Sequence, residues 1–256
     1  MTPRMGLGRD FATLAWMLAR LLACAGRPRK HAKAFHRRAA QRAMSVVGAD
    51  SLPIVSVIAA CTGIILALQA VQQLEKVGAL SYAATMVAVI LVRELGPLLT
   101  AVIVTGRSGA AFAAEIATMQ ISEEIDALEV MGIDPVRFLV WPKLLAMLVM
   151  VPCLTLVANA VGIAAGGVFS TAFLGIDGEA WLSHSLAYLG RQDIIASLTK
   201  SLGFAACITI VGCWQGFLAR QGAEDVGRRT TKAVVLSIFV IVLLDLFFTG
   251  LNYLFR

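Results

Sequence analysis

Long apolar runs separated by short polar stretches dominate the chain from residue 51 onward. Each run is long enough to cross about 30 Å of hydrocarbon at about 1.5 Å of rise per helical residue. The five runs cover residues 51–74, 79–105, 144–171, 194–218 and 233–254. A chain in lipid must satisfy its own backbone hydrogen bonds, so each run predicts a transmembrane helix. The pattern therefore predicts an all-α polytopic membrane protein, with residues 1–256 forming one domain.

The N-terminal segment, residues 1–46, follows a different pattern. Residues 10–25 are apolar but too short to span the bilayer and they carry Arg20, which favours an interfacial helix lying on the membrane. A basic run follows, with seven Lys or Arg and no acidic residue between Arg27 and Arg42. Such a run acts as a topology signal that keeps this side cytoplasmic, and it also attracts anionic lipid heads.

The distribution of positive charge predicts the orientation of the spans. Five spans with a cytoplasmic N-terminus place residues 107–137 and 219–232 inside, and residues 172–193 and the C-terminus outside. In that orientation the cytoplasmic parts, together with Lys143 just before the third span, hold seventeen of the twenty-two Lys and Arg residues, as the positive-inside rule requires. The segment 172–193 contains a stretch expected to form a short amphipathic helix, with Trp181 and Tyr188 at the membrane interface. Pro53 and Gly63 leave open a broken or re-entrant first span.

Composition excludes several classes of protein. Hydrophobic residues make up 59% of the chain and charged residues 15%, and the mean hydropathy of +0.81 is too high for an ordinary soluble domain. The net charge of +6 is concentrated near the N-terminus, so we expect a membrane surface and not nucleic acid as its partner. The five cysteines show no CxxC spacing, and we expect no disulfide and no metal site. A P-loop and the HExxH and GxSxG motifs are absent from the sequence, which argues against an enzyme.

Four ionisable residues lie inside the predicted spans: Arg93, Glu94, Lys200 and Asp245. Unpaired charges in hydrocarbon are costly, so each needs a partner or a wet cavity. Arg93 and Glu94 are about 100° apart on a helix, and we expect each to face a separate partner. Lys200 and Asp245 lie at similar depths and could meet, either as a structural ion pair or as the lining of a cavity for a charged lipid head. Gln69 is a further candidate for that lining.

The same four ionisable residues also suit a rival function, an ion- or proton-coupled secondary carrier that uses them as a relay. Such a carrier has no need of a docking helix, and the sequence shows no internal inverted repeat.

An acidic segment lies between the second and third spans. Residues 107–143 hold six of the sixteen acidic residues. Ile121, Ile125 and Leu128 follow helical spacing and predict a helix over 113–131, with an apolar stripe beside a face of carboxylates. The Asp134–Pro135 pair ends it. This helix is either a docking surface or a solvated connection between two spans.

The sequence VRELGPLLTAVIVTGRSGAAFAAE and the following EEIDALEVMGIDPVRFLVWPKLLA resemble the MlaE/YrbE permease family, the membrane subunits of ABC lipid transporters that work with MCE-domain proteins. The resemblance is dense over residues 90–147. It implies that the acidic segment is the coupling helix that seats in a cytoplasmic ATPase. Glu124 stands where the family usually has glutamine, and Lys143 where it has arginine. The residues expected at that contact are Glu115, Glu123, Glu124, Ile125, Asp126, Leu128, Met131, Asp134 and Arg137.

The resemblance also implies the assembly and the function. The chain would be the permease subunit of a homodimer in the bacterial inner membrane, with its N-terminus cytoplasmic and its C-terminus periplasmic. Two ATPases would use ATP and Mg, and this chain would bind no cofactor itself. Phospholipid would pass between the inner membrane and a periplasmic MCE-domain protein, which maintains outer-membrane lipid asymmetry.

Overall fold

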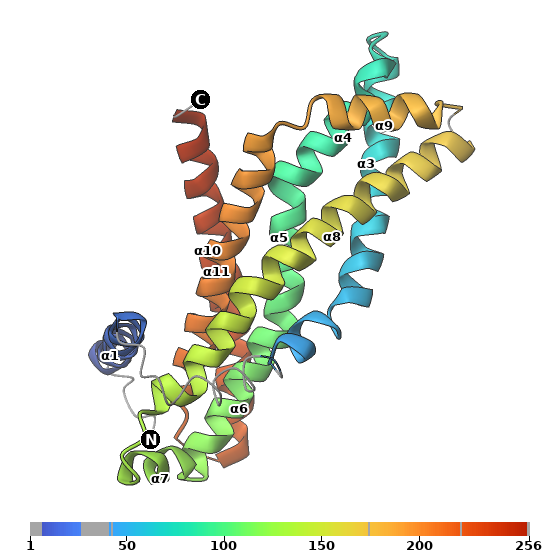
Figure 1. Cartoon of the computed structure of the whole chain (residues 1–256). Coiled ribbons are helices and arrows are strands. Elements are labelled where there is room, and N and C mark those ends of the chain that lie inside the picture. Colours follow the sequence, from blue (N-terminus) through green and yellow to red (C-terminus); the bar gives the residue numbers. More distant parts are fainter. Residues whose placement is uncertain (1–6, 27–40, 42, 174, 221, 255–256) are drawn as a thin grey trace. The chain divides into compact units, whose positions relative to one another are not determined.

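A computed structural model describes residues 7–26, 41, 43–173, 175–220 and 222–254 (Figure 1). These residues form helices joined by turns, and none of them lies in a strand. Among them are five helical segments that are long and apolar enough to cross a membrane. The predicted all-α polytopic class is therefore confirmed. Nearly all of the predicted basic run lies outside the described residues.

The helices follow one another with short connections. In chain order they are α1 Leu7–Gly26, α3 Leu52–Glu75, η2 Leu80–Tyr82, α4 Ala83–Ile90, η3 Leu91–Leu95, α5 Gly96–Val104, η4 Thr105–Gly109, α6 Ala110–Ile121, α7 Glu124–Val130, η5 Val136–Val140, α8 Trp141–Phe173, α9 Gly178–Ala187, α10 Arg191–Phe217 and α11 Gly222–Leu254. Of these, η2 is a 3₁₀ turn, whereas η3, η4 and η5 are π-helical.

The chain divides into two compact units. Unit 1 takes in the described parts of Met1–Val47, Val104–Val149 and Ala205–Val240. Unit 2 takes in the described parts of Gly48–Ile103, Met150–Phe204 and Ile241–Arg256.

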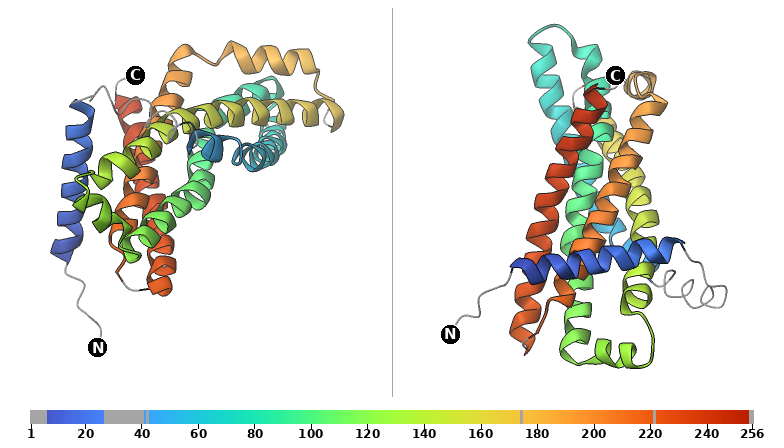
Figure 2. Two further views of the ribbon diagram at one scale, coloured as in Figure 1. Left: turned by 60° about the horizontal axis from the view of Figure 1, so that its bottom comes forward. Right: turned by 90° about the vertical axis from the view of Figure 1, so that its left-hand side faces the viewer.

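Unit 2 begins with a hairpin of α3 and α4, visible as the blue-to-teal pair in Figure 2. The turn between them contains Gly78 at φ 69°, a left-handed conformation that glycine adopts without strain. α3 is one continuous helix of 24 residues, so the alternative of a broken first span is not observed. Gly63 does not break the helix; it lets α3 approach α8, since a Cβ there would lie 2.0 Å from the Gly162 carbonyl oxygen.

α9 completes the packing of unit 2 and corrects one prediction. The short helix is present as expected, but Trp181 is buried and does not face a membrane interface. Its indole Nε1 donates to the Ile163 carbonyl at 3.3 Å, and its ring packs with Leu91 and Val87 in an apolar cluster. Gly167 leaves room for that ring, because a Cβ there would come within 2.7 Å of it. Tyr188, by contrast, is exposed, and its place at the membrane interface stays a prediction.

Unit 1 contains a helix at the N-terminus, α1, where the sequence predicts an interfacial helix, and α1 packs against η5. Met17 and Leu21 form its buried side, while Trp16 meets Phe217 edge to face with ring centroids 6.3 Å apart. α10 approaches η4 and α6 through two glycines four residues apart. A Cβ at Gly212 would lie 3.0 Å from the Gly109 carbonyl oxygen, and one at Gly216 would lie 2.7 Å from Ile116.

Two predicted boundaries are wrong. The second apolar helical segment runs from Leu80 to Ile121, so the helix continues well past the predicted end at residue 105. The predicted loop 219–232 is helical from Gly222 onward. Residues 219–232 were assigned to a loop because they are polar, although polar side chains are compatible with a helix that extends beyond the lipid.

Candidate functional site

A buried lysine in unit 2 is the centre of the polar network within the predicted spans. Lys200 of α10 has a side chain only 3% exposed. Its Nζ lies 2.6 Å from Glu94 Oε2, 2.9 Å from Asp245 Oδ1 and 2.8 Å from Thr249 Oγ1. Glu94 and Thr249 accept hydrogen bonds from the ammonium group, and Asp245 adds an ion pair. The predicted Lys200–Asp245 contact is thus present, and Glu94 shares in it.

Glu94 is held by a hydroxyl as well as by the lysine. Thr249 Oγ1 donates to Glu94 Oε1 at 3.1 Å while accepting from Lys200. Two carboxylates, one ammonium and one hydroxyl thus connect η3, α10 and α11. Such a set is favourable only when every member is paired, because a charge without its partner in a protein interior is strongly destabilising.

Arg93, the neighbour of Glu94, has a different partner. Its Nε lies 2.7 Å from Asp193 Oδ1 in the first turn of α10. The other carboxylate oxygen, Asp193 Oδ2, accepts from the Gly190 amide at 3.0 Å and so fixes the start of that helix. Arg93 and Glu94 therefore face separate partners, as their angular separation predicted.

A π-helical turn presents this pair. In η3 the Gly96 amide donates to the Leu91 carbonyl, five residues back, and Pro97 follows with no amide to donate. Gly96 also leaves space for Asn159, whose Oδ1 would lie 1.8 Å from a Cβ at that position. The irregularity therefore lies at Leu91–Leu95, the turn that includes the residues whose side chains carry the charges.

Arg93, Glu94 and Lys200 line one cavity of about 540 Å³ within unit 2. The side chains of Arg93 and Glu94 are 29% and 38% exposed, so both are open to this space. The cavity wall contains both polar and apolar side chains. The other lining residues are Gln192, Asp193, Ile195, Ala196, Thr199, Phe248, Thr249, Leu251, Asn252 and Tyr253. The volume falls within the range of about 300–1,000 Å³ found for small-molecule sites.

Two predicted lining residues are not part of that wall. Asp245 does not line the cavity and instead contacts Lys200. Gln69 is also absent from the wall, and it is exposed on α3 because Ala67 and Ala70 occupy the buried side of that helix. The prediction for Gln69 rested on polarity alone, which does not specify the face of a helix.

The acidic segment lies in unit 1 and is not the single helix predicted over 113–131. α6 ends at Ile121 and α7 begins at Glu124, because Glu123 adopts a left-handed conformation with φ 61°. Ser122 occupies the break, and its Oγ hydrogen bonds to Thr118 O at 2.9 Å and Glu124 Oε1 at 3.0 Å. The predicted stripe is therefore interrupted between Ile121 and Ile125.

α7 still presents acidic groups to solvent. Glu123, Glu124 and Asp126 are exposed, whereas Ile125 is buried and Leu128 partly buried. An exposed apolar tip follows α7, consisting of Val130, Met131 and Ile133. Sequence analysis identified only Met131 of these three. Exposed apolar side chains beside carboxylates are typical of a contact surface.

The remaining predicted contact residues in this segment make intrachain contacts. Lys143 Nζ pairs with Glu115 Oε1 at 2.8 Å and lies 5.6 Å from the centroid of the Phe112 ring, which ties α6 to α8. Asp134 Oδ1 accepts from the Val136 amide at 3.1 Å, and its Oδ2 pairs with Arg20 of α1 at 3.1 Å. Arg137 is partly buried in η5. Glu115 and Asp134 thus connect the acidic segment to α8 and α1 by ion pairs.

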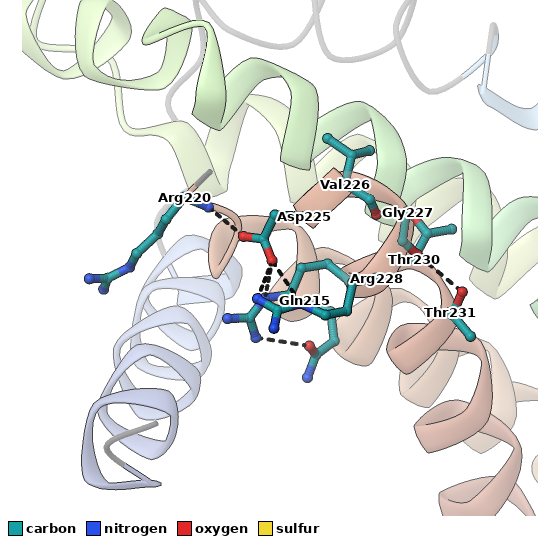
Figure 3. A network of polar contacts seen from close by, with 9 residues as sticks. Gln215, Arg220, Asp225, Val226, Gly227, Arg228, Thr230 and Thr231 are labelled. Atoms are coloured by element: carbon teal, nitrogen blue, oxygen red, sulfur yellow. Dashed lines mark hydrogen bonds and ion pairs between the residues drawn. The ribbon is translucent and has the colours of Figure 1, made fainter. Parts of the chain in front are cut away.

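Sequence analysis did not identify a further polar cluster in unit 1, at the start of α11 (Figure 3). Asp225 Oδ2 accepts from the Arg220 amide at 2.8 Å, and Oδ1 accepts from Arg228 Nη2 at 2.7 Å. Arg229 Nη1 donates to Gln215 Oε1 of α10 at 3.5 Å and its Nε lies 3.7 Å from Asp225 Oδ1. An acidic residue in a first helical turn was the available sequence signal.

Asp225 precedes the apolar run 233–254, and its ionisation is perturbed. Burial alone would raise the pKa of this carboxyl. The hydrogen bonds from Arg228 and the Arg220 amide, with the charges of Arg229 and Arg228, outweigh burial and lower the pKa.

Comparisons with known proteins were made for the whole chain. The family described as Permease MlaE matches residues 40–251. A probable ABC transporter permease protein of Rickettsia typhi is 38% identical over 212 residues, which cover 83% of this chain and 82% of the relative. A probable ABC transporter permease protein of Synechocystis is 36% identical over 85% of this chain and 83% of the relative. The chloroplastic protein trigalactosyldiacylglycerol 1 of Arabidopsis thaliana is 34% identical over 82% of this chain and 60% of the relative.

Proposed function

Because the chain belongs to the MlaE permease family, we propose that it is the membrane subunit of an ATP-driven transporter that moves phospholipid. The cavity of unit 2 carries this proposal. Ionised side chains line a space of about 540 Å³ in helices that are otherwise apolar enough to lie in lipid. A phospholipid has the matching character, since its head is charged and its tails are apolar. The name of the Arabidopsis relative refers to a glycerolipid, which supports a lipid as the substrate.

The energy source in this proposal is a separate cytoplasmic ATPase that uses ATP and Mg. The relatives' name, ABC transporter permease, supports such a partner. α7 is the proposed contact, because Glu123, Glu124 and Asp126 project beside the apolar tip at Val130 and Met131. The Glu115–Lys143 and Arg20–Asp134 pairs would carry movement of α7 to α8 and α1, since they connect the segment to those helices.

The proposed assembly is a homodimer in the bacterial inner membrane that exchanges lipid with a periplasmic MCE-domain protein and maintains outer-membrane lipid asymmetry. The excess of Lys and Arg in the segments assigned to the cytoplasm supports the orientation, with the N-terminus inside and the C-terminus outside. The homodimer and the MCE partner rest on the family resemblance.

The docking role is tested by reversing charge at Glu123 and Asp126 together. Both side chains are exposed, and exposed substitutions usually change stability by less than about 0.5 kcal/mol. We expect normal membrane yield with loss of the copurifying ATPase. Reversal of Glu179, an acidic residue in the first turn of α9, is the matched control and should retain the ATPase. Undiminished ATPase binding in the Glu123 and Asp126 variant would exclude this docking surface. Lipid transfer driven by a proton gradient, without an ATPase, would favour the alternative of a proton-coupled secondary carrier.

A further inference from the structure

The charges that line the cavity differ in their availability to a ligand. Lys200 is almost wholly buried; its Nζ donates to Glu94 and Thr249 and forms an ion pair with Asp245. A lipid head entering the cavity therefore meets Arg93 and Glu94, whose side chains are both partly exposed. These two residues are adjacent in η3, so one helical turn places a cation and an anion side by side in the cavity wall.

Arg93 retains donors for a ligand despite its ion pair. Asp193 Oδ1 lies 2.7 Å from Nε, and the Arg93 side chain remains 29% exposed at the cavity wall. The terminal nitrogens of a planar guanidinium suit the oxygens of a phosphate. Arg93 therefore supplies one half of a head-group site.

Glu94 supplies the other half. Its carboxylate faces the cavity while its contacts to Lys200 and Thr249 come from the wall side. Across the network the two cations Arg93 and Lys200 stand against three carboxylates, Glu94, Asp193 and Asp245. The network has a formal net charge of −1, so it favours a head that brings a positive group together with its phosphate.

We propose that the cavity selects a zwitterionic phospholipid head, with the phosphate at Arg93 and the ammonium at Glu94, over an anionic head. This inference rests on the proposed function. An anionic head such as that of phosphatidylglycerol brings its phosphate toward Glu94 without an ammonium to offset the repulsion, and Glu94 then stays with Lys200. Repulsion of this kind is a common means of rejecting a wrong ligand.

The test uses the full chain in complex with its ATPase, reconstituted in vesicles that contain phosphatidylethanolamine, phosphatidylcholine and phosphatidylglycerol at equal fractions. ATP-dependent transfer of each lipid is measured by mass spectrometry. Both zwitterionic lipids should exceed phosphatidylglycerol by about five-fold, which corresponds to about 1 kcal/mol. Equal transfer of the three lipids, or preference for phosphatidylglycerol, would overturn the inference.

Variants test the role of each charge. Glu94→Gln should bring the ratio of zwitterionic to anionic lipid close to one, because the amide neither attracts an ammonium nor repels an anion. Glu94→Asp should keep the preference, and Arg93→Gln should lower transfer of all three lipids alike. Gln69→Ala, outside the cavity wall, is the control and should change neither ratio nor rate. A ratio unchanged by Glu94→Gln would remove Glu94 as the selecting group.

Failure of the proposed function has a separate signature. If no lipid of any head group is transferred with ATP, the cavity is not a phospholipid site. If all three are transferred equally, the transporter stands and only the selection is wrong. The wild-type ratio decides this without any variant, so poor folding of Glu94→Gln does not prevent the test.

Discussion

Removing Lys200 should destabilise the protein more than removing either of its carboxylate partners. Lys200→Met leaves Glu94 and Asp245 facing the same buried position with no cation between them, since Nζ lies 2.6 and 2.9 Å from their oxygens. Removing one member of a buried pair generally costs about 3–5 kcal/mol. Asp245→Asn leaves Lys200 with Glu94 and Thr249, so the loss should be that of one charged hydrogen bond, about 1.5–3 kcal/mol.

The double variant Lys200→Met/Asp245→Asn gives the sharper result. It leaves one carboxylate, Glu94, whose side chain is 38% exposed to the cavity and can be hydrated there. We therefore expect the double variant to be more stable than Lys200→Met alone. Residues that share one network are coupled in this way, so their effects do not add.

Equilibrium unfolding in detergent, followed by tryptophan fluorescence, measures these differences. Lys76→Met in the exposed turn after α3 is the control and should change stability by less than about 0.5 kcal/mol. Equal losses for Lys200→Met and Asp245→Asn would contradict the arrangement of three partners around Lys200. A double variant that loses the sum of both single effects would contradict the network as a whole.

Two further predictions concern helix packing and pH. Gly63→Ala should destabilise the protein by about 1–3 kcal/mol, because the new Cβ would lie 2.0 Å from the Gly162 carbonyl oxygen. Gly250→Ala is the control, since a Cβ there would have no atom within 4 Å. It should be neutral or stabilising in the same unfolding assay. Asp225 has a lowered pKa, so its contribution is complete above its unfolded value near 3.9 and is lost as pH falls through the lower folded value. Asp225→Asn should abolish that part of the acid destabilisation, and an unchanged acid profile would contradict it.

The apolar runs predicted the spans well because length and hydropathy are local properties of the sequence. α3, α8 and α10 each lie within three residues of the predicted spans at both ends. Tertiary partners were harder to predict. The Lys200–Asp245 contact followed from matching depths, but Glu94 is 106 residues from Lys200 and its approach depends on which helices are neighbours. No periodicity along one helix carries that information.

The break before α7 shows a different limit. Ser122 and Glu123 are both compatible with a helix interior, and nothing in the local pattern marks Glu123 for a left-handed conformation. The conformation depends on the hydrogen bonds of Ser122 to Thr118 and Glu124. At the start of α11 the signal was present, since Gly222 at φ 58° and the acidic residue Asp225 are typical of a turn followed by a helix.

The second carboxylate on Lys200 explains how Glu94 can both pair with a buried cation and bind a ligand. If Glu94 were the only partner of Lys200, moving it toward a ligand's ammonium would strand a charge that is 3% exposed. With the proposed ligand, the Asp245 ion pair and the Thr249 hydrogen bond would still hold Lys200 if Glu94 turned away, and the ligand's own cation would replace the lysine at Glu94. A neutral or anionic head offers no such replacement. The arrangement therefore ties release of Glu94 from Lys200 to the presence of a positive group on the substrate.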